Sequence, residues 1–348
     1  VGSLVKLHKT LKILVTGGLG YIGSHVTVLL LEQNIEVVCI DNLDNSRLEV
    51  LEGINNITQK RPLFKNLDLK DKGELANFFK EHDNIHGIIH FAAHKSVYES
   101  SKKPLDYYNN NIIGLLNILN FSVEKDIPFI YSSSSTVYGD VKVSPINEEA
   151  ATNDPKSPYG NTKLIGEQIL KDCFNASNKF KTIILRYFNP IGAHPTGNIG
   201  EHPLGIPQNL IPYLTQTAIG KHPFLRVFGS DYETEDGTCI RDYIHIMDLA
   251  KAHIESINYL LHFKNKKMYD IFNVGTGRGF SVLEVIKAFE KVTGEKVPFK
   301  FVGPRDGDIP IAFADVKKIY KKMGWKAKFT LEDGLKSAWN WEKNSRKF

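Results

Sequence analysis

The chain contains three tyrosine–lysine pairs with a spacing of four residues, which places two helical side chains on one face, a turn apart. They are Tyr98 with Lys102, Tyr138 with Lys142, and Tyr159 with Lys163. Such a pair can move a proton, because a nearby ammonium favours the phenolate of a tyrosine whose ordinary pKa is near 10. Some pairs are expected by chance in a lysine-rich chain, where a charged residue on a helix is usually solvated. The surroundings of each pair must therefore decide its role.

The surroundings favour the third pair. Tyr98 precedes the polar stretch "ESSKKP" without a strand end nearby, and Tyr138 is followed by Gly139 and Asp140, which are typical of a turn. Tyr159 instead begins a helical stretch that extends to about residue 172, and "SSSST" ends a predicted strand some 25 residues earlier. Ligands bind at the carboxyl ends of strands in open α/β sheets. We therefore predict that Tyr159, Lys163 and Ser134 form the catalytic group, with the Ser134 hydroxyl orienting the substrate oxygen.

A glycine-rich segment near the start of the chain predicts a dinucleotide site. "TGGLGYIG" places Gly17, Gly20 and Gly23 in a GxxGxxG spacing between a strand and a helix. Backbone without side chains can approach a pyrophosphate, whose charge then meets the helix N-terminus. The next strand ends at Asp41, an acid that accepts hydrogen bonds from ribose hydroxyls and repels a 2′-phosphate. The predicted cofactor is NAD, and Lys163 would hold its nicotinamide ribose while lowering the pKa of Tyr159.

The order of elements predicts an α/β fold with a Rossmann-type doubly wound parallel sheet. Strands are expected at 12–16, 36–41, 62–68, 87–93, 128–134 and 181–189, with helices between them, including 21–33 and 104–125. After residue 189 a segment rich in Gly, Pro and His is too irregular for a regular element, and shorter elements follow. We predict a dinucleotide-binding domain over 11–189 and a smaller substrate-binding α/β domain over 190–348, with interleaving segments.

Composition excludes several classes of function. The chain has 348 residues and a formal net charge of only +5, and no Lys/Arg block suggests nucleic acid as a partner. Its three cysteines are widely spaced, which is typical of a reducing compartment and argues against a disulfide framework or a zinc site. No apolar run has the length of a membrane span, and the first residues do not have the pattern of a signal peptide. We expect a cytoplasmic protein without a metal.

The GxxGxxG spacing resembles the extended short-chain dehydrogenase/reductase family, and longer motifs narrow the resemblance. "VTGGLGYIGSH", "DNLDNS", "HFAAHKSV", "SSSSTVYGD", "SPYGNTK", "LRYFNPIGAHP", "GTCIRDYIHIMDLA" and "FNVGTG" together resemble the UDP-glucose 4-epimerase family. The likeness extends from about residue 11 to 341. Besides the glycine loop, Asp41, Ser134, Tyr159 and Lys163, it implies NAD contacts from Tyr21, Ile22, Asn42, Asn45, Ser46, Asp68, Leu69, Phe91, Ala92, Lys95, Asn110 and Phe188.

The same resemblance implies a UDP-sugar site. Arg241 and Arg305 would clamp the diphosphate, because a guanidinium fork matches phosphate oxygens. Asp308 would meet the uridine ribose and Phe228 would lie beside the uracil. The remaining implied substrate contacts are Lys95, Ser134, Thr136, Tyr159, Asn189, Asn209, Leu210 and Ala312.

One comparison separates relatives of this fold. Nucleotide-sugar 4,6-dehydratases carry Thr-Asp-Glu at the end of the strand where this chain has Ser134, Ser135 and Thr136. Without a carboxylate there, the resemblance implies epimerisation of UDP-glucose and UDP-galactose at C4, through a 4-keto sugar and tightly bound NAD. The alternatives are an epimerase that prefers UDP-N-acetylhexosamines or UDP-hexuronic acids, and a non-catalytic NAD-sensing regulator. The resemblance also implies a homodimer.

Ala312 bears on the choice of sugar. It lies four positions after Asp308, where the family has a gate residue. Family members restricted to UDP-glucose and UDP-galactose carry a Tyr at this position, and those that accept N-acetylated sugars carry a small residue. Ala312 therefore predicts activity on UDP-GlcNAc and UDP-GalNAc as well.

Overall fold

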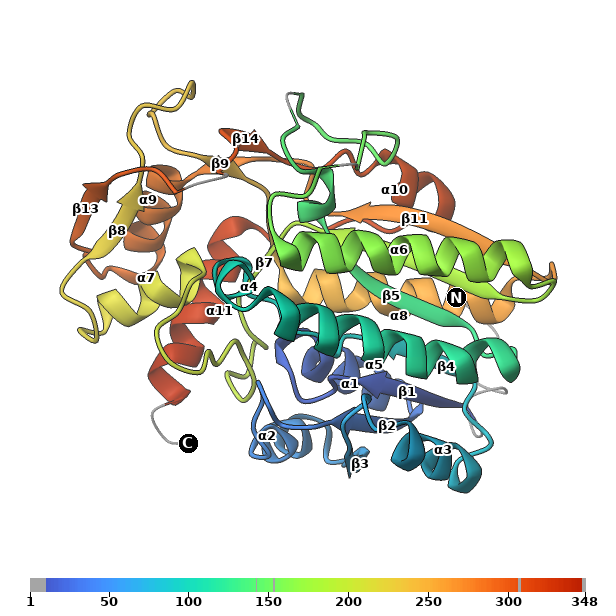
Figure 1. The fold of residues 1–348 in the computed structure, drawn as a ribbon. Coiled ribbons are helices and arrows are strands. Elements are labelled where there is room, and N and C mark those ends of the chain that lie inside the picture. The colour runs from blue at the N-terminus through green and yellow to red at the C-terminus, as the bar shows by residue number, and fades with distance from the viewer. Residues whose placement is uncertain (1–10, 142, 153, 306–307, 346–348) are drawn as a thin grey trace. The chain divides into compact units, whose positions relative to one another are not determined.

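The computed structural model describes residues 11–141, 143–152, 154–305 and 308–345 (Figure 1). The chain forms two compact units, each assembled from separate segments. The first comprises the described residues within Val1–Val137, Ser157–Arg186 and Ala250–Phe272, and the second those within Tyr138–Lys156, Tyr187–Leu249 and Asn273–Phe348. Each unit is described separately below.

A twisted sheet forms the centre of the first unit. Among the described residues it has seven strands in the order β11-β6-β5-β4-β1-β2-β3, and the pairs around β1 and β4 are parallel. Their bounds are β1 Lys12–Thr16, β2 Glu36–Asp41, β3 Leu63–Asn66, β4 Gly87–His90, β5 Phe129–Ser134, β6 Lys181–Tyr187 and β11 Met268–Val274. β4 and β5 are buried at every position, since helices cover both faces of a parallel sheet.

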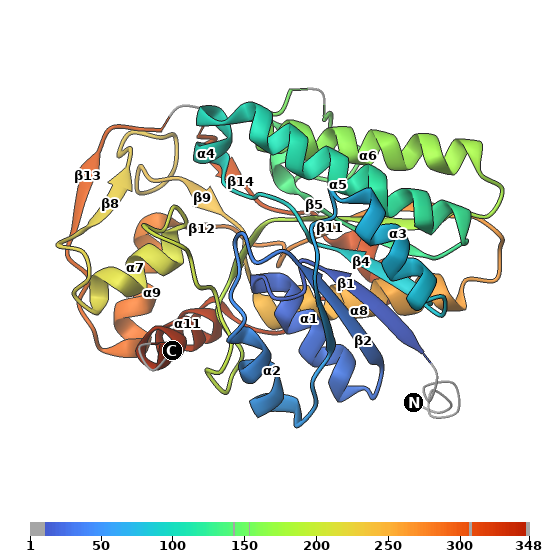
Figure 2. The same ribbon diagram turned by 60° about the horizontal axis from the view of Figure 1, so that its bottom comes forward.

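Helices lie on both sides of this sheet (Figure 2). One side carries α3 Lys72–Glu81, α5 Pro104–Glu124 and α6 Pro158–Ala176, and the other carries α1 Tyr21–Glu32, α2 Val50–Thr58 and α8 Ile246–His262. The short helix α4 Val97–Lys102 precedes α5, which begins at Pro104, where a missing N–H has no effect on helical hydrogen bonding. Leu75, Phe78, Leu115, Ile118 and Leu170 bring the helices of the first side into one buried core with the strands.

The second unit is built from small sheets and four helices among its described residues. The sheets have the orders β10-β7, β12-β9-β14 and β13-β8. Strand bounds are β7 Asn189–Ile191, β8 Leu225–Phe228, β9 Ile240–Arg241, β10 Tyr243–His245, β12 Phe280–Ser281, β13 Phe299–Val302 and β14 Ile311–Ala312. Helix bounds are α7 Leu210–Ala218, α9 Val282–Thr293, α10 Lys317–Met323 and α11 Leu331–Asn344. Ile191, Leu214, Phe289, Leu335 and Trp339 belong to its buried core.

The observed strands confirm the predicted α/β class, including the parallel sheet. The prediction of irregular structure after residue 189 was wrong at Asn189–Ile191, which pairs in parallel with β10. Pro190 is compatible with this strand because a two-stranded sheet leaves one edge without ladder bonds. In the part of the chain that the structure describes, no helix combines the length and apolarity that crossing a bilayer requires.

Candidate active site

The glycine loop lies at the carboxyl end of β1, and close backbone packing explains two of its glycines. Gly17 has φ +66°, and a Cβ there would lie 2.7 Å from the Ala92 nitrogen. A Cβ on Gly23 would collide with the Gly17 carbonyl. A Cβ on Gly20, in contrast, would meet only the Gly17 oxygen, at 3.2 Å. Close packing therefore explains the missing side chains at Gly17 and Gly23, whereas Gly20 is partly exposed and less crowded.

Helix α1 presents its N-terminus directly after this loop. Gly20 is the N-cap, no side chain caps the helix, and its first turn has no acidic residue. The positive end of the helix dipole is thus available to an anion. An uncapped helix N-terminus without an acidic residue in its first turn fits the pyrophosphate of a dinucleotide.

The Asp41 carboxylate ends β2 beside the loop and is only 8% exposed. It accepts hydrogen bonds from the Leu19 N–H at 3.0 Å, the Leu43 N–H at 3.0 Å and the Ser46 hydroxyl at 2.7 Å. A carboxylate offers about four acceptor positions, so three donors leave room for one ribose hydroxyl. A 2′-phosphate beside this buried negative charge would be repelled. The environment of Asp41 therefore fits NAD.

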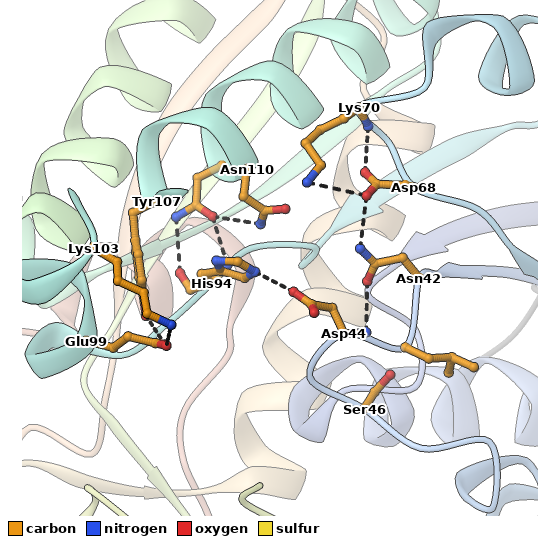
Figure 3. Close-up of polar contacts among 12 residues, drawn as sticks. Asn42, Asp44, Ser46, Asp68, Lys70, His94, Glu99, Lys103, Tyr107 and Asn110 are labelled. Atoms are coloured by element: carbon orange, nitrogen blue, oxygen red, sulfur yellow. Dashed lines mark hydrogen bonds and ion pairs between the residues drawn. The ribbon is translucent and has the colours of Figure 1, made fainter. Parts of the chain in front are cut away.

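Other residues predicted for the cofactor also come together in the first unit. Figure 3 shows the Asn42 amide donating to Asp68 at 3.3 Å, and Asp68 also accepts from the Lys70 N–H at 2.8 Å. Burial by itself would raise the pKa of Asp68, but the hydrogen bonds from Lys70 and Asn42 outweigh it, so this pKa is lowered. Lys95 Nζ lies 5.9 Å from the centre of the Tyr21 ring, linking the loop after β4 to the start of α1.

The remaining predicted cofactor residues differ in exposure and contacts. Leu69 is buried, and its carbonyl accepts from Asn117. Phe91 packs against His253 with ring centres 4.7 Å apart, and the Ala92 N–H donates to Thr16. Asn110 donates to Asn111, Ile22 is half-buried and Asn45 is exposed. Phe188 lies in the second unit, where it is buried and its N–H donates to Val274. Their roles in binding NAD stay predictions.

Helix α6 positions the predicted catalytic pair. Ser157 caps the helix by accepting from the Gly160 N–H at 3.1 Å, and Pro158 occupies the first turn. Tyr159 is 9% exposed and Lys163 4% exposed, one turn apart on a buried face. Tyr159 lies close enough to Ser134, at the end of β5, for hydrogen bonding by the serine to lower the pKa of Tyr159. Ser134 Oγ also accepts from the Thr136 N–H at 3.2 Å. The structure thus brings Tyr159, Lys163, Ser134 and Thr136 into one unit.

The electrostatics differ from the simple expectation that Lys163 lowers the pKa of Tyr159. Burial raises the pKa of Tyr159 to about 12, although the hydrogen bond with Ser134 opposes this. Burial also lowers the pKa of Lys163 to about 7, against the attraction of the Glu167 carboxylate. Lys163 Nζ donates to the Ser132 carbonyl at 2.7 Å and lies 6.0 Å from the centre of the Tyr159 ring. Burial is therefore the largest influence on the pKa of both Tyr159 and Lys163.

A buried ion pair fixes α6 against the sheet below this site. Glu167 accepts from Arg186 Nε at 2.9 Å and Nη2 at 2.5 Å, and from the Ser133 hydroxyl at 2.5 Å. These three residues belong to α6, β6 and β5. Bidentate pairing holds Glu167 in one orientation. The helix that carries Tyr159 and Lys163 therefore has a fixed register on the strand that ends at Ser134.

The other two pairs lack this environment. Tyr98 is 63% exposed on α4, with Lys102 Nζ 5.8 Å from its ring centre, so its interpretation as a surface residue is confirmed. Tyr138 ends the 3₁₀ turn Ser135–Tyr138 and donates its hydroxyl to Asn273 at 2.6 Å. Its partner Lys142 lies outside the described residues.

Four of the predicted substrate residues converge in the second unit. Asp308 accepts from Arg305 Nε at 2.9 Å and Nη2 at 3.1 Å, and its Oδ1 lies 3.6 Å from Arg241 Nη2. The Arg305 guanidinium lies 4.8 Å from the centre of the Phe228 ring. Ala312 is the register partner of Arg241 between β14 and β9. Two guanidiniums against one carboxylate leave a net positive charge beside an aromatic ring, which suits a nucleoside diphosphate.

The remaining substrate candidates are less closely grouped. Asn189 is exposed at the start of β7, where its N–H donates to the Asp242 carbonyl. Asn209 is the N-cap residue of α7 and its amide donates to Glu201 at 3.0 Å. Leu210 packs against the core of this unit. Their contacts with substrate stay predictions.

The sequence interpretation missed several residues that shape the first unit. A Cβ on Gly18 would lie 2.6 Å from Cys39 Sγ, so the doubled glycine of "TGGLG" has a packing role. The Asn111 side chain accepts from the His94 N–H at 2.8 Å and donates to the His94 carbonyl at 3.1 Å and to Thr162 at 2.9 Å. Asn111 is 6% exposed, and its position as a polar residue on the apolar face of α5 is the sequence signal that could have identified it.

Among the described residues, no cluster of three His, Cys, Asp or Glu could hold a metal ion.

Comparison with known proteins agrees with this geometry. A protein-family model described as GDP-mannose 4,6 dehydratase matches residues 14–338. UDP-glucose 4-epimerase of Dictyostelium discoideum is 47% identical over 335 residues, covering 95% of each chain. The crystal structure of UDP-glucose-4-epimerase from Stenotrophomonas maltophila, with bound NAD and formylated UDP-arabinopyranose, has a TM-score of 0.93 at 44% identity and covers 97% of this chain and 99% of that one. The UDP-Glc/GlcNAc 4-epimerase of Campylobacter jejuni has a TM-score of 0.82 at 36% identity, covering 96% and 99%.

The chain belongs to the extended short-chain dehydrogenase/reductase family of NAD-dependent nucleotide-sugar epimerases and dehydratases. Within that family it belongs with the UDP-glucose 4-epimerases.

Proposed function

We propose that this protein interconverts UDP-glucose and UDP-galactose by inversion at C4, with NAD retained through each turnover, and that it also interconverts UDP-GlcNAc and UDP-GalNAc. The observation that carries the proposal is the burial of Tyr159 and Lys163 one helical turn apart on α6, with Tyr159 close enough to Ser134 for hydrogen bonding to lower the tyrosine pKa. A hydroxyl pair of this kind can exchange a proton with a sugar oxygen away from water.

The roles of the side chains follow from their positions. Tyr159 takes the proton of the sugar O4 and later returns it, while Ser134 holds that oxygen by hydrogen bonding. Lys163, on the same helix face, supplies positive charge near the phenolate and binds the nicotinamide ribose. When bound, NAD supplies reversible hydride exchange with C4 of the sugar. The glycine loop, the N-terminus of α1 and Asp41 hold the dinucleotide.

The UDP group is assigned to the basic cluster of the second unit. Arg241 and Arg305 bind the diphosphate, Asp308 binds the uridine ribose, and Phe228 lies beside the uracil. Asp308 pairs with the fork of Arg305, so a diphosphate competes with this carboxylate for the guanidinium. Asn189, Asn209, Leu210, Thr136 and Lys95 complete the proposed contacts.

Activity on N-acetylated sugars is supported by the small side chain of Ala312, which is only partly buried beside Arg241 in β14. The Campylobacter jejuni relative, by its description, epimerises both UDP-Glc and UDP-GlcNAc. Two alternatives remain within this site: a preference for UDP-N-acetylhexosamines, and activity on UDP-hexuronic acids.

Two measurements on one protein preparation test the proposed function. We expect the purified protein, without added cofactor, to convert UDP-galactose to UDP-glucose and UDP-GalNAc to UDP-GlcNAc. Denaturing the same protein should release NAD or NADH in an amount approaching one per chain, because the protein's own residues retain the cofactor. UDP-galacturonate is the control substrate. Release of mainly NADP would contradict the role of Asp41, and a protein that carries NAD but converts no UDP-sugar would instead be a regulator.

We propose that the protein is a homodimer whose interface is formed by α5 and α6. We also propose that it is cytoplasmic. Leu105, Ile113 and Leu116 of α5 are 79%, 40% and 43% exposed, and Ile165 of the adjacent α6 is 38% exposed. Their spacing on α5 forms one apolar stripe, which fits a second copy of the same helix pair.

Light scattering after size exclusion tests this partner state. The wild type should have twice the mass of the monomer, and Leu116→Glu should have the monomer mass, because a charge would be buried in the interface. Tyr320→Glu, at a 58% exposed site on α10, is the matched control and should stay dimeric. A monomeric wild type would contradict the proposal.

A further inference from the structure

The loops that follow β2 and β4 are joined by one side-chain contact. His94 Nε2 lies 2.7 Å from Asp44 Oδ2, as Figure 3 shows. A carboxylate oxygen cannot donate, so the imidazole N–H is the donor in this hydrogen bond. The residues are 50 positions apart in the chain, and nothing in the proposed catalytic or binding roles uses either of them.

The strand order places this contact next to the glycine loop. β2 and β4 are the two neighbours of β1, and the glycine loop follows the carboxyl end of β1. A bond between the loops after β2 and β4 therefore joins the two loops that flank the glycine loop. The residues proposed to contact NAD from these two loops are Asn42, Asn45 and Ser46 after β2, and Phe91, Ala92 and Lys95 after β4. The contact thus links both walls of the proposed dinucleotide site.

Both ends of the contact are held in place. The backbone N–H and carbonyl of His94 are both bonded to the Asn111 side chain, and the His94 ring packs edge-on against Tyr107 with centres 5.3 Å apart. The Tyr107 hydroxyl accepts from the Ser96 N–H and donates to Glu99.

On the other side, the Asp44 N–H donates to Asn42, in a loop that Asp41 also fixes through Leu43 and Ser46. Because the His94 ring is packed and the Asp44 backbone is bonded, less conformational entropy is lost on pairing than for two free side chains.

We propose that the hydrogen bond between His94 and Asp44 is a clasp that slows the release of NAD. The inference rests on the proposed NAD site, and it adds two positioning residues that act through the loops. NAD can leave only when the loops on its two sides separate, and this bond must break first. The side chains are 26% and 59% exposed, so the expected effect is that of a solvated pair, an increase in release rate of about fivefold when it is lost.

The test measures dissociation of NAD from the purified holoenzyme. A dehydrogenase that reduces free NAD, added with its own substrate, reports the release rate as NADH absorbance. Asp44→Ala and His94→Leu should each increase the rate constant about fivefold, and the double variant should also be about fivefold faster, because one bond is lost in all three. The matched control is Lys179→Ala, which removes a 3.0 Å ion pair with Asp126. This pair joins the loops that precede β5 and β6, at the amino ends of the strands, whereas His94 and Asp44 follow the carboxyl ends. The control variant should release NAD at the wild-type rate.

The outcomes separate this inference from the proposed function. A wild-type protein without NAD would overturn the NAD site itself. Retained NAD with wild-type release from the single variants would overturn the clasp alone. A double variant about 25-fold faster than wild type would show two independent effects instead of one bond. Slower release from Asp44→Ala would show that Asp44 repels the cofactor.

Discussion

Tyr159→Phe is expected to lower kcat by about 10²- to 10⁴-fold on UDP-galactose, the range that loss of a positioned acid–base group produces. The substitution removes only the Tyr159 hydroxyl and keeps the ring in its packing site, because the residue is only 9% exposed. The fold and the NAD content per chain should therefore remain those of the wild type. Steady-state kinetics and NAD released on denaturation measure the two quantities.

The sequence provides a matched control for this variant. Tyr98→Phe alters an exposed tyrosine that also has a lysine four residues later, with Lys102 Nζ 5.8 Å from its ring. It should keep wild-type kcat. Lys163→Met should lower both kcat and NAD content, since one ammonium has two proposed roles. Near-normal turnover by Tyr159→Phe would make Tyr159 a packing residue of α6 and leave the acid–base group unassigned.

Ala312→Tyr is expected to lower activity on UDP-GalNAc by about hundredfold or more while sparing UDP-galactose, because a phenol ring would occupy the space of the acetamido group. Ala312 is the register partner of Arg241, so a larger side chain at this position would project beside the proposed diphosphate residue. The ratio of kcat/KM for the two substrates is the measurement.

Ala312→Ser is the control for Ala312→Tyr and should convert both substrates, because the side chain remains small. Failure of the wild-type protein to convert UDP-GalNAc would refute the hypothesis that Ala312 leaves room for the acetamido group. Equal loss of both activities in Ala312→Tyr would instead indicate damage to β14 or to Arg241.

Much of the first unit could be predicted from local sequence patterns. The predicted strands 12–16 and 36–41 match β1 and β2, and the predicted helices 21–33 and 104–125 match α1 and α5 to within one residue at each end. These elements are specified by short-range features, such as continuous apolar strands, the glycines before α1 and Pro104 at the start of α5. β7 escaped prediction because its pairing partner β10 is more than 50 residues away.

The features of the candidate active site also divide into those predictable from local sequence and those that depend on tertiary packing. The sequence by itself determined the glycine loop, the acid at the end of β2, and the helix that places Tyr159 and Lys163 on one face, because each depends on spacing within one element or one turn. It could not show that burial would raise the pKa of Tyr159 and lower that of Lys163, since desolvation depends on every neighbour.

Only the tertiary structure brought Arg241, Arg305, Asp308 and Phe228 into one cluster, and only it joined His94 to Asp44. These contacts form between residues on separate loops and strands, and chain folding alone decides which of them meet. Motif spacing thus determined which reactive side chains this protein has. The three-dimensional packing decided which side chains contact one another, how burial shifts their pKa values, and which loops are joined beside the cofactor site.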